Sequence, residues 1–492
     1  MPQPASLPDL RQLFAEDPHR ASSLSWQLGG MTFDWSKLHL TSEWLGTLQS
    51  QASDAGYGEA IDRLFAGEVI NTTEGRAAEH LAERGSGSDD SVALATARHR
   101  RMFGLIDAVE AGAFGDVTGV LHIGIGGSAL GPALLVDALG RRERRYKVRV
   151  VANIDGQALD EAISDLDPAT TIVAIASKTF TTTETLRNAD SAIAWLQENG
   201  VEDPFGRLIA LTAAPQKAVE FGIDETRVLP FAESVGGRYS MWSSIGFPAA
   251  LALGTEAFTQ LLEGAALVDA HVREATPDAN LPFIAAAADR LYAERYGAGT
   301  RAIFAYDERL RLLTPYLQQL VMESNGKSVS VQGEALHVPS SAILWGGTGT
   351  DAQHAVFQLL HQGTHLNPVE FIAVAQGADD QDAAHHRALL LNAFAQGAAL
   401  MAGKESDDPH RRYSGNRPSA TILLDHLDPQ TIGALIAFYE HRTFAEAVLI
   451  GINPFDQFGV ELGKSIASAI DDPEGREGFD PSTRALIEKA GL

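Results

Sequence analysis

The sequence contains no cysteine, which excludes disulfide bonds, thiol nucleophiles and thiolate metal sites. Positive charge is also scarce, because 38 Lys and Arg residues stand against 64 Asp and Glu residues, giving a formal net charge of −26. A chain this acidic is a poor candidate for nonspecific binding to nucleic acid or to an anionic membrane. If the protein binds an anion, a local site must supply enough hydrogen-bond donors and positive charge to overcome the repulsion from the net negative charge.

Long apolar runs are missing as well. No window reaches the ~18 apolar residues that a membrane-spanning helix needs. The first twenty residues do not place an apolar segment behind a basic one, so we expect no secretory signal. The 492 residues are enough for several domains. We therefore expect a soluble, cytoplasmic, multidomain protein.

Short apolar runs alternate with helical patterns after a mostly helical N-terminal stretch. The expected strands are 117–125, 147–154, 171–177 and 207–213 in a first series, and 301–306, 341–347, 369–375 and 421–427 in a second. This alternation indicates crossover units. We predict an α/β fold with two doubly wound domains, whose parallel sheets are flanked by helices. The predicted divisions are a helical N-terminal segment at 1–115, domains at 116–274 and 275–470, and a tail at 471–492.

One strand runs directly into a turn rich in hydroxyl groups, IASKTFTTTETL at 175–186. We expect the next helix to begin near Thr181 or Thr182, with Thr181 and Glu184 forming a capping box. A helix N-terminus offers unpaired N–H groups and partial positive charge, so hydroxyls and a lysine placed there favour phosphate binding. The candidate phosphate ligands are Ser177, Lys178, Thr179 and Thr182.

A glycine loop, GIGGSALGP at 124–132, offers two interpretations. It fits a dinucleotide-binding fingerprint, with Asp155 at the end of the next strand as the ribose ligand. The fingerprint positions are Gly124, Gly126 and Ala129. Alternatively, its glycines and Ser128 let a backbone approach a small sugar phosphate. The sequence therefore leaves a nicotinamide-dependent dehydrogenase and a sugar-phosphate enzyme open.

The segment TPYLQQLVMESNGKS at 314–328 is typical of a helix capped by Thr314 and ended by Asn325-Gly326. Glu323 then lies in the last turn, facing the negative end of the helix dipole. This position favours proton uptake and suits a general base.

Two histidines follow a second glycine loop, in GTGTDAQHAVFQLLHQGT at 347–364. His354 and His361 are two helical turns apart, ~10.5 Å, which is too far to share a metal ion. We assign His361 to the end of the helix and take His354 as an acid–base candidate.

Two further segments carry positive charge beside glycines. Arg238 follows two glycines in ESVGGRYSMWSSIG, where a guanidinium could neutralise developing negative charge. Gln457 and Lys464 lie seven residues apart in NPFDQFGVELGKSIA, on one face of an expected helix.

Taken together, these motifs resemble the glucose-6-phosphate isomerase (phosphoglucose isomerase) family. They occur in that family's order between about residues 120 and 467, as GIGGSALGP, SKTFTTTET, GGRYSMWSSIG, ESNGK, TDAQHAVFQLLHQGT and NPFDQFGVELGK. The resemblance implies an aldose–ketose isomerase that works through a cis-enediol(ate), without a redox cofactor or a metal. It also implies that the two α/β domains are of the sugar-isomerase type. It further implies a homodimer, with His354 reaching the site of the neighbouring subunit.

The resemblance further implies a role for each candidate residue. Glu323 would move the proton between carbons 2 and 1, Arg238 would stabilise the intermediate, and His354 and Lys464 would assist ring opening. The implied substrate-binding residues are Gly127, Ser128, Ser177, Lys178, Thr179, Thr182 and Gln457. A dehydrogenase and a non-catalytic sugar-phosphate sensor remain the alternatives.

Overall fold

The computed structural model describes residues 6–141, 145–378, 381–472 and 475–492. The chain forms two compact units, Met1–Pro454 and Phe455–Leu492. The four short stretches outside the described ranges fall within the predicted N-terminal segment, domains and tail, and those parts of the predictions lie outside the described residues. The predicted domain bounds stay a prediction.

A five-stranded sheet in the first unit has the order β4-β3-β5-β6-β7, and all its neighbouring strands are parallel. The strands are β3 (Gly119–Ile123), β4 (Lys147–Val151), β5 (Thr171–Ala176), β6 (Leu208–Thr212) and β7 (Val228–Pro230). The first four confirm the predicted first series, whereas the three-residue β7 was not predicted. The connecting helices are α7 (Gly127–Leu139), α8 (Gly156–Ile163), α9 (Thr183–Glu198) and α10 (Pro215–Glu220).

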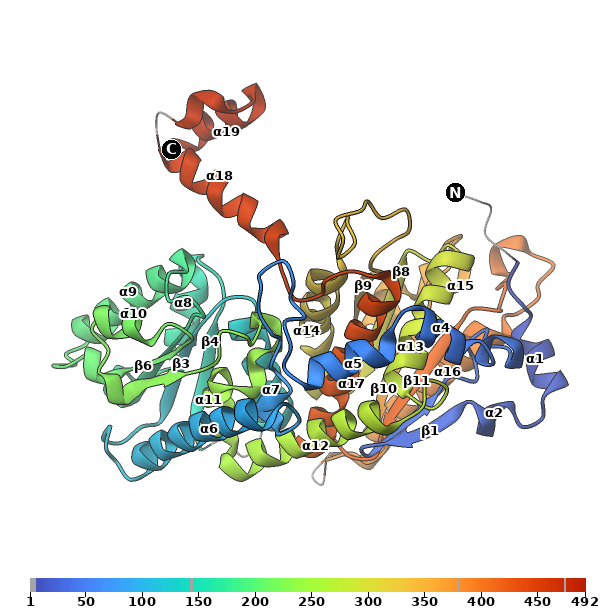
Figure 1. Ribbon diagram of the computed structural model, residues 1–492, viewed down its shortest axis with the longest axis horizontal. Helices are drawn as coiled ribbons and strands as arrows, with labels where there is room; N and C mark the ends of the chain where they lie inside the picture. Colours follow the sequence, from blue (N-terminus) through green and yellow to red (C-terminus); the bar gives the residue numbers. More distant parts are fainter. Residues whose placement is uncertain (1–5, 142–144, 379–380, 473–474) are drawn as a thin grey trace. The chain divides into compact units, whose positions relative to one another are not determined.

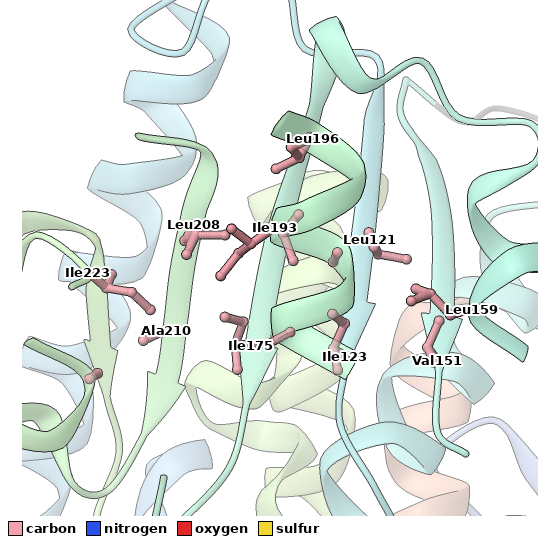
Figure 2. Packing of buried hydrophobic residues seen from close by; sticks show 14 of the residues in the cluster. Leu121, Ile123, Val151, Leu159, Ile175, Ile193, Leu196, Leu208, Ala210 and Ile223 are labelled. Atoms are coloured by element: carbon pink, nitrogen blue, oxygen red, sulfur yellow. The ribbon is translucent and has the colours of Figure 1, made fainter. Parts of the chain in front are cut away.

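Helices cover this sheet because its strands are apolar on both faces. Every residue of β3, β5 and β6 is buried. In Figure 2, Ile193 and Leu196 of α9 lie over the sheet beside Leu121, Ile175 and Leu208. Burial of this kind stabilises the fold by about 25 cal/mol per Å² of apolar surface.

A second, six-stranded sheet has the order β1-β2-β11-β10-β8-β9. Its strands β8 (Thr300–Tyr306), β9 (Ile343–Thr348), β10 (Val369–Val374) and β11 (Ser419–Leu424) are parallel and confirm the predicted second series. The helices after these strands are α14 (Leu313–Gln318), α15 (Gly349–Gln362), α16 (Ala383–Ala402) and α17 (Pro429–Ile450). Parallel sheets flanked by helices are therefore present in both halves of the first unit (Figure 1).

The N-terminal segment is not only helical. Its strands β1 (Ser25–Leu28) and β2 (Met31–Asp34) form a hairpin, and β2 pairs antiparallel with β11. Gly29 and Gly30 have φ values of 57° and 73°, so both turn residues occupy the left-handed region that two-residue hairpins require. The helices of this segment are α1 (Leu10–Glu16), α2 (Arg20–Ser23), α3 (Ser42–Leu45), α4 (Leu48–Asp54), α5 (Tyr57–Phe65) and α6 (Asp89–Glu110).

Three more helices of the first unit connect its two sheets along the chain: α11 (Phe247–Leu253), α12 (Thr255–Glu274) and α13 (Leu281–Arg290). Helix α17 packs against α12 and α13 and is buried from Thr431 to Ala447. A helix that is buried on all sides has a fixed position, which makes it a rigid support for its neighbours.

The second unit contains α18 (Glu461–Asp471) and α19 (Pro481–Ala490). Among the described residues of the whole chain, none of the helices combines the length and apolar character needed to span a bilayer.

Candidate active site

Two predicted loops begin at neighbouring points of the first sheet. Ile123 of β3 pairs with Ile175 of β5, so the glycine loop and the hydroxyl-rich turn leave the sheet side by side. Strand β4 lies on the other side of β3, which makes this the position where the strand order reverses. Ligands of open α/β sheets bind in the crevice at that position, beyond the carboxyl ends of the strands.

The hydroxyl-rich turn is held in an unusual backbone conformation. Phe180 has a φ of 51°, although its side chain is buried in the core. The Ser177 hydroxyl accepts a hydrogen bond from the Phe180 amide at 3.1 Å and lies 3.0 Å from the Thr182 hydroxyl. A non-glycine residue in this region is strained, and such strain collects at ligand sites.

Helix α9 begins directly after this turn, as predicted, but without the predicted capping box. Its N-cap residue is Thr182, which makes no side-chain capping bond, and the Thr181 hydroxyl pairs with Thr179 at 2.8 Å instead. The capping-box prediction was therefore wrong. The first amides of α9 thus lack a side-chain cap and can serve an anionic ligand.

Lys178 lies in the same turn and is partly buried. Burial lowers the pKa of its ammonium group to about 8, and the nearby Arg76 adds to this effect. Arg238 is another of the positive charges that act on it. An anion bound at the turn would relieve this repulsion between cations.

The glycine loop is in close contact with the segment that carries Arg238. A Cβ atom added to Gly127 would lie 2.1 Å from the carbonyl carbon and oxygen of Gly237 and 2.5 Å from the Arg238 nitrogen. Only glycine permits this approach of two backbones. The glycine loop therefore fixes the position of the Arg238 backbone.

A buried histidine fixes the glycine loop, and a helix cap accounts for Asp155, the acidic residue that had suggested a dinucleotide. Burial lowers the pKa of His122 on β3 to about 4, so its neutral ring donates from Nε2 to the Ser128 carbonyl at 2.6 Å. The Asp155 carboxylate caps α8 by accepting from the Gln157 amide at 3.1 Å. Nothing found supports the nicotinamide interpretation.

Glu323 lies at the end of an irregular helix. Helix α14 changes into a π-helical segment, Gln319–Glu323, which ends at Ser324, and π-helical turns are frequent at functional sites. The predicted last-turn position of Glu323 is confirmed, but the predicted Thr314 cap was wrong. The helix begins at Leu313, and the Thr314 hydroxyl donates to the Ile303 carbonyl at 3.3 Å.

Arg238 is buried beside Glu323. Its Nη1 lies 3.6 Å from Glu323 Oε1, and its Nε donates to the Ser324 hydroxyl at 2.7 Å. Its Nη2 donates to the Pro454 carbonyl at 2.5 Å, and its guanidinium lies 5.4 Å from the centre of the Tyr239 ring. A fixed cation next to a partly exposed carboxylate can stabilise an anion formed by proton abstraction.

Gln319 was not singled out from the sequence. A Cβ added to Gly126 would lie 2.9 Å from Gln319 Nε2, so this amide lies over the glycine loop. Its Oε1 is buried and has no hydrogen-bond partner among the described residues. Its position four residues before Glu323 was the only signal in the sequence that could have identified it.

The structure does not bring His354, which was also predicted to be catalytic, into this cluster. His354 lies on α15 and is exposed, and its side chain makes no hydrogen bond to another described residue. His361 ends the same helix, as predicted, and its Nε2 pairs with Gln396 Oε1 at 2.9 Å. Gln457 and Lys464 belong to the second unit, where Lys464 is exposed on α18. The catalytic and binding roles of all these residues stay predictions.

The chain is similar to proteins of known class over almost its whole length. The family model described as phosphoglucose isomerase matches residues 34–487. The chain is 62% identical to a glucose-6-phosphate isomerase of Rhizorhabdus wittichii over 98% of this chain and 96% of that one. It is 60% identical to the protein of the same name from Zymomonas mobilis, over 98% and 95% of the two chains. A crystal structure of a glucose-6-phosphate isomerase from Chlamydia trachomatis superposes with a TM-score of 0.89, at 30% identity over 99% of this chain and 96% of that one.

Proposed function

The chain belongs to the phosphoglucose isomerase family, and from this premise we propose that it interconverts glucose 6-phosphate and fructose 6-phosphate. The reaction opens the sugar ring and moves one proton through a cis-enediol(ate). The observation that carries this proposal is the buried Arg238 lying 3.6 Å from the carboxylate of Glu323, at the end of a π-helical turn.

Phosphate binding is assigned to the turn that begins α9. Ser177, Lys178, Thr179 and Thr182 supply hydroxyls and a charge, and the helix supplies amides without a side-chain cap. The phosphate is remote from the reacting carbons, so its binding energy can orient the sugar chain for proton transfer.

Proton transfer is assigned to Glu323, which takes a proton from one of the first two carbons and returns it to the other. The negative charge that develops on the sugar oxygens is stabilised by Arg238. Gly127 and Ser128 line the sugar site, since their loop is in contact with the Arg238 segment. We add Gln319 to the binding residues, because its unpaired Oε1 and the glycine loop offer a sugar hydroxyl an acceptor.

Ring opening is assigned to His354 and Lys464, with Gln457 near the phosphate. His354 would act in the site of a second subunit of a homodimer, which agrees with its exposure on α15. Leu359 of α15 is 43% exposed, and Leu391 and Phe394 of α16 are 52% and 47% exposed. Apolar side chains gathered on two packed helices are typical of an interface between subunits.

We place the enzyme in the cytoplasm, in glycolysis and gluconeogenesis, because a charged sugar phosphate does not cross a bilayer unaided. The proposed chemistry needs no redox cofactor and no metal, since a carboxylate and fixed cations supply the base and the charge stabilisation.

The proposal is tested by measuring glucose 6-phosphate formation from fructose 6-phosphate with the purified protein in a coupled assay. Turnover that is lost in Glu323→Gln supports the isomerase. Binding of fructose 6-phosphate without turnover would instead support a sensor, and quenching of nicotinamide fluorescence would support the dehydrogenase.

A further inference from the structure

Helix α17 carries buried carboxylates that the proposed reaction does not use. Glu440 and Glu446 are 1% and 2% exposed, and they lie six positions apart on the helix. That spacing corresponds to about 9 Å along the helix axis. Burying a carboxylate is unfavourable unless it is hydrogen-bonded or paired, and both of these groups have hydrogen-bond partners.

Glu446 is bonded to the turn that carries Glu323. Its Oε2 accepts a hydrogen bond from Asn325 Nδ2 at 3.1 Å, and the same amide donates to the Thr443 carbonyl at 3.1 Å. Asn325 is two residues beyond Glu323, at the point where the helix ends. Arg290 of α13 approaches the other Glu446 oxygen at 4.0 Å.

Glu440 is bonded in the same way to the segment that carries Arg238. Its Oε1 accepts from Trp242 Nε1 at 2.8 Å, and its Oε2 pairs with Arg84 at 2.5 Å. Trp242 is the last residue of the short 3-10 helix Gly237–Trp242, whose second residue is Arg238. The Arg84 guanidinium also lies 4.9 Å from the centre of the Trp242 ring and pairs with Asp269 of α12.

The two segments that meet at the reacting groups are thus both attached to one rigid helix. We propose that Glu440 and Glu446 are positioning residues, which hold Arg238 and Glu323 at their mutual distance through Trp242 and Asn325. This inference rests on the function proposed above. Neither carboxylate touches the sugar in this scheme. A misplacement of about 1 Å at a reacting group can lower a rate by 10²-fold, so the effect on catalysis should be large.

The test compares kcat and KM for fructose 6-phosphate in Asn325→Ala, Glu446→Leu, the double variant and Glu446→Gln. Each of the first two should lower kcat about ten- to a hundredfold, with KM within about twofold of the unmodified protein. The double variant should be no slower than the slower single variant, because both changes break the same hydrogen bond between Asn325 and Glu446. Glu446→Gln keeps an acceptor for Asn325, so its kcat should return to within about threefold.

Trp242→Phe provides an independent arm. It removes the donor to Glu440 while keeping an aromatic ring over Arg84, and it should lower kcat in the same range. If Glu446→Leu does not fold, Trp242→Phe and Asn325→Ala still test the positioning role of the two carboxylates. The matched control is Glu370→Gln, which changes a 3% exposed carboxylate paired with Arg442 and Tyr439 of the same helix and leaves the bonds of Trp242 and Asn325 in place. It should lower the melting temperature and leave kcat of the folded protein unchanged.

Three results would overturn the inference: folded variants with unchanged kcat, losses that multiply in the double variant, or an equal loss of kcat in Glu370→Gln. Its failure is distinguishable from failure of the proposed function. If the unmodified protein isomerises and the variants have the same kcat, the positioning role is refuted while the proposed function stands. An unmodified protein that does not isomerise refutes both.

Discussion

Replacing Gly127 by alanine should separate catalysis from folding more sharply than any change to a charged residue. The added Cβ would lie 2.1 Å from the Gly237 carbonyl group and 2.5 Å from the Arg238 nitrogen. Ordinary carbon contacts are ~3.5–4.0 Å, so the two backbones must separate by more than about 1 Å. The three nearest of these atoms all belong to backbone, which cannot rotate aside as a flexible side chain can. The displacement therefore falls on the segment that holds Arg238.

Overpacking of this kind should lower the free energy of unfolding by about 1–3 kcal/mol. Moving Arg238 by about 1 Å should lower kcat for fructose 6-phosphate by about 100-fold. The coupled assay measures kcat, and urea denaturation measures the free energy of unfolding. Gly104→Ala is the control, because a Cβ at this position in α6 meets nothing within 4 Å. It should leave kcat unchanged and raise stability by ~0.5–1 kcal/mol. A folded Gly127→Ala enzyme with kcat within twofold of the unmodified protein would refute the reasoning.

Three further predictions concern the other candidate residues. Burial and Arg76 lower the pKa of Lys178 to about 8, so the KM for fructose 6-phosphate should be constant below pH 8 and rise by up to tenfold per pH unit above it. The rise follows because the free enzyme loses the Lys178 proton, whereas the enzyme with bound phosphate retains it. Lys178→Arg should abolish this rise in initial-rate measurements between pH 6.5 and 9.5. Glu323→Gln should lower kcat by about 10²–10⁴-fold with little change in KM, whereas Lys178→Ala should mainly raise KM, and the reverse pattern in steady-state kinetics would contradict both assignments. If His354 acts across a homodimer, mixing inactive Glu323→Gln and His354→Ala subunits in equal amounts should restore about a quarter of full activity. Half of the dimers are then mixed, and each mixed dimer has one complete site out of two. No recovery after verified subunit exchange would argue that His354 acts in the site of its own chain.

The sequence was sufficient to predict most of the parallel strands. β3, β5 and β8 are apolar runs between helical patterns, and their bounds agree with prediction within a few residues. The hairpin β1–β2 was missed because its strands have only four residues each and lie among helices. The Gly29-Gly30 pair between them was the available signal.

The order of strands in the sheet could not be predicted from spacing along the chain. The glycine loop and the hydroxyl-rich turn are separated in sequence by β4, yet β3 and β5 are neighbours because β4 takes the edge position. Motifs alone therefore identified both loops but not their adjacency. Gln319 illustrates the same limit, since its importance depends on a contact with Gly126 that only tertiary structure creates.

Sequence rules for helix starts and caps also failed at the segments that form the candidate site. Thr181 and Glu184 have capping-box spacing, but the Thr181 hydroxyl pairs with Thr179 and α9 starts without a side-chain cap. Helix signals around Thr314 placed the start of the helix two residues late and gave no indication of the π-helical turn that ends with Glu323. Departures from local preference are expected where function shapes the backbone.

The pairing of β2 with β11 has a consequence for how the chain folds during its synthesis. Early and late parts of the chain also meet at the Leu10 amide, which donates to the Asn416 side chain 406 residues later. Ribosomes add about 5–20 residues per second, so the hairpin leaves the exit tunnel roughly 20–80 s before its partner strand. During that interval Met31, Phe33 and Trp35, which are all buried in the finished protein, have no sheet to cover them. The nascent chain therefore exposes the apolar side chains of its amino-terminal hairpin for most of its time on the ribosome. This is the segment that a chaperone would need to shield from aggregation.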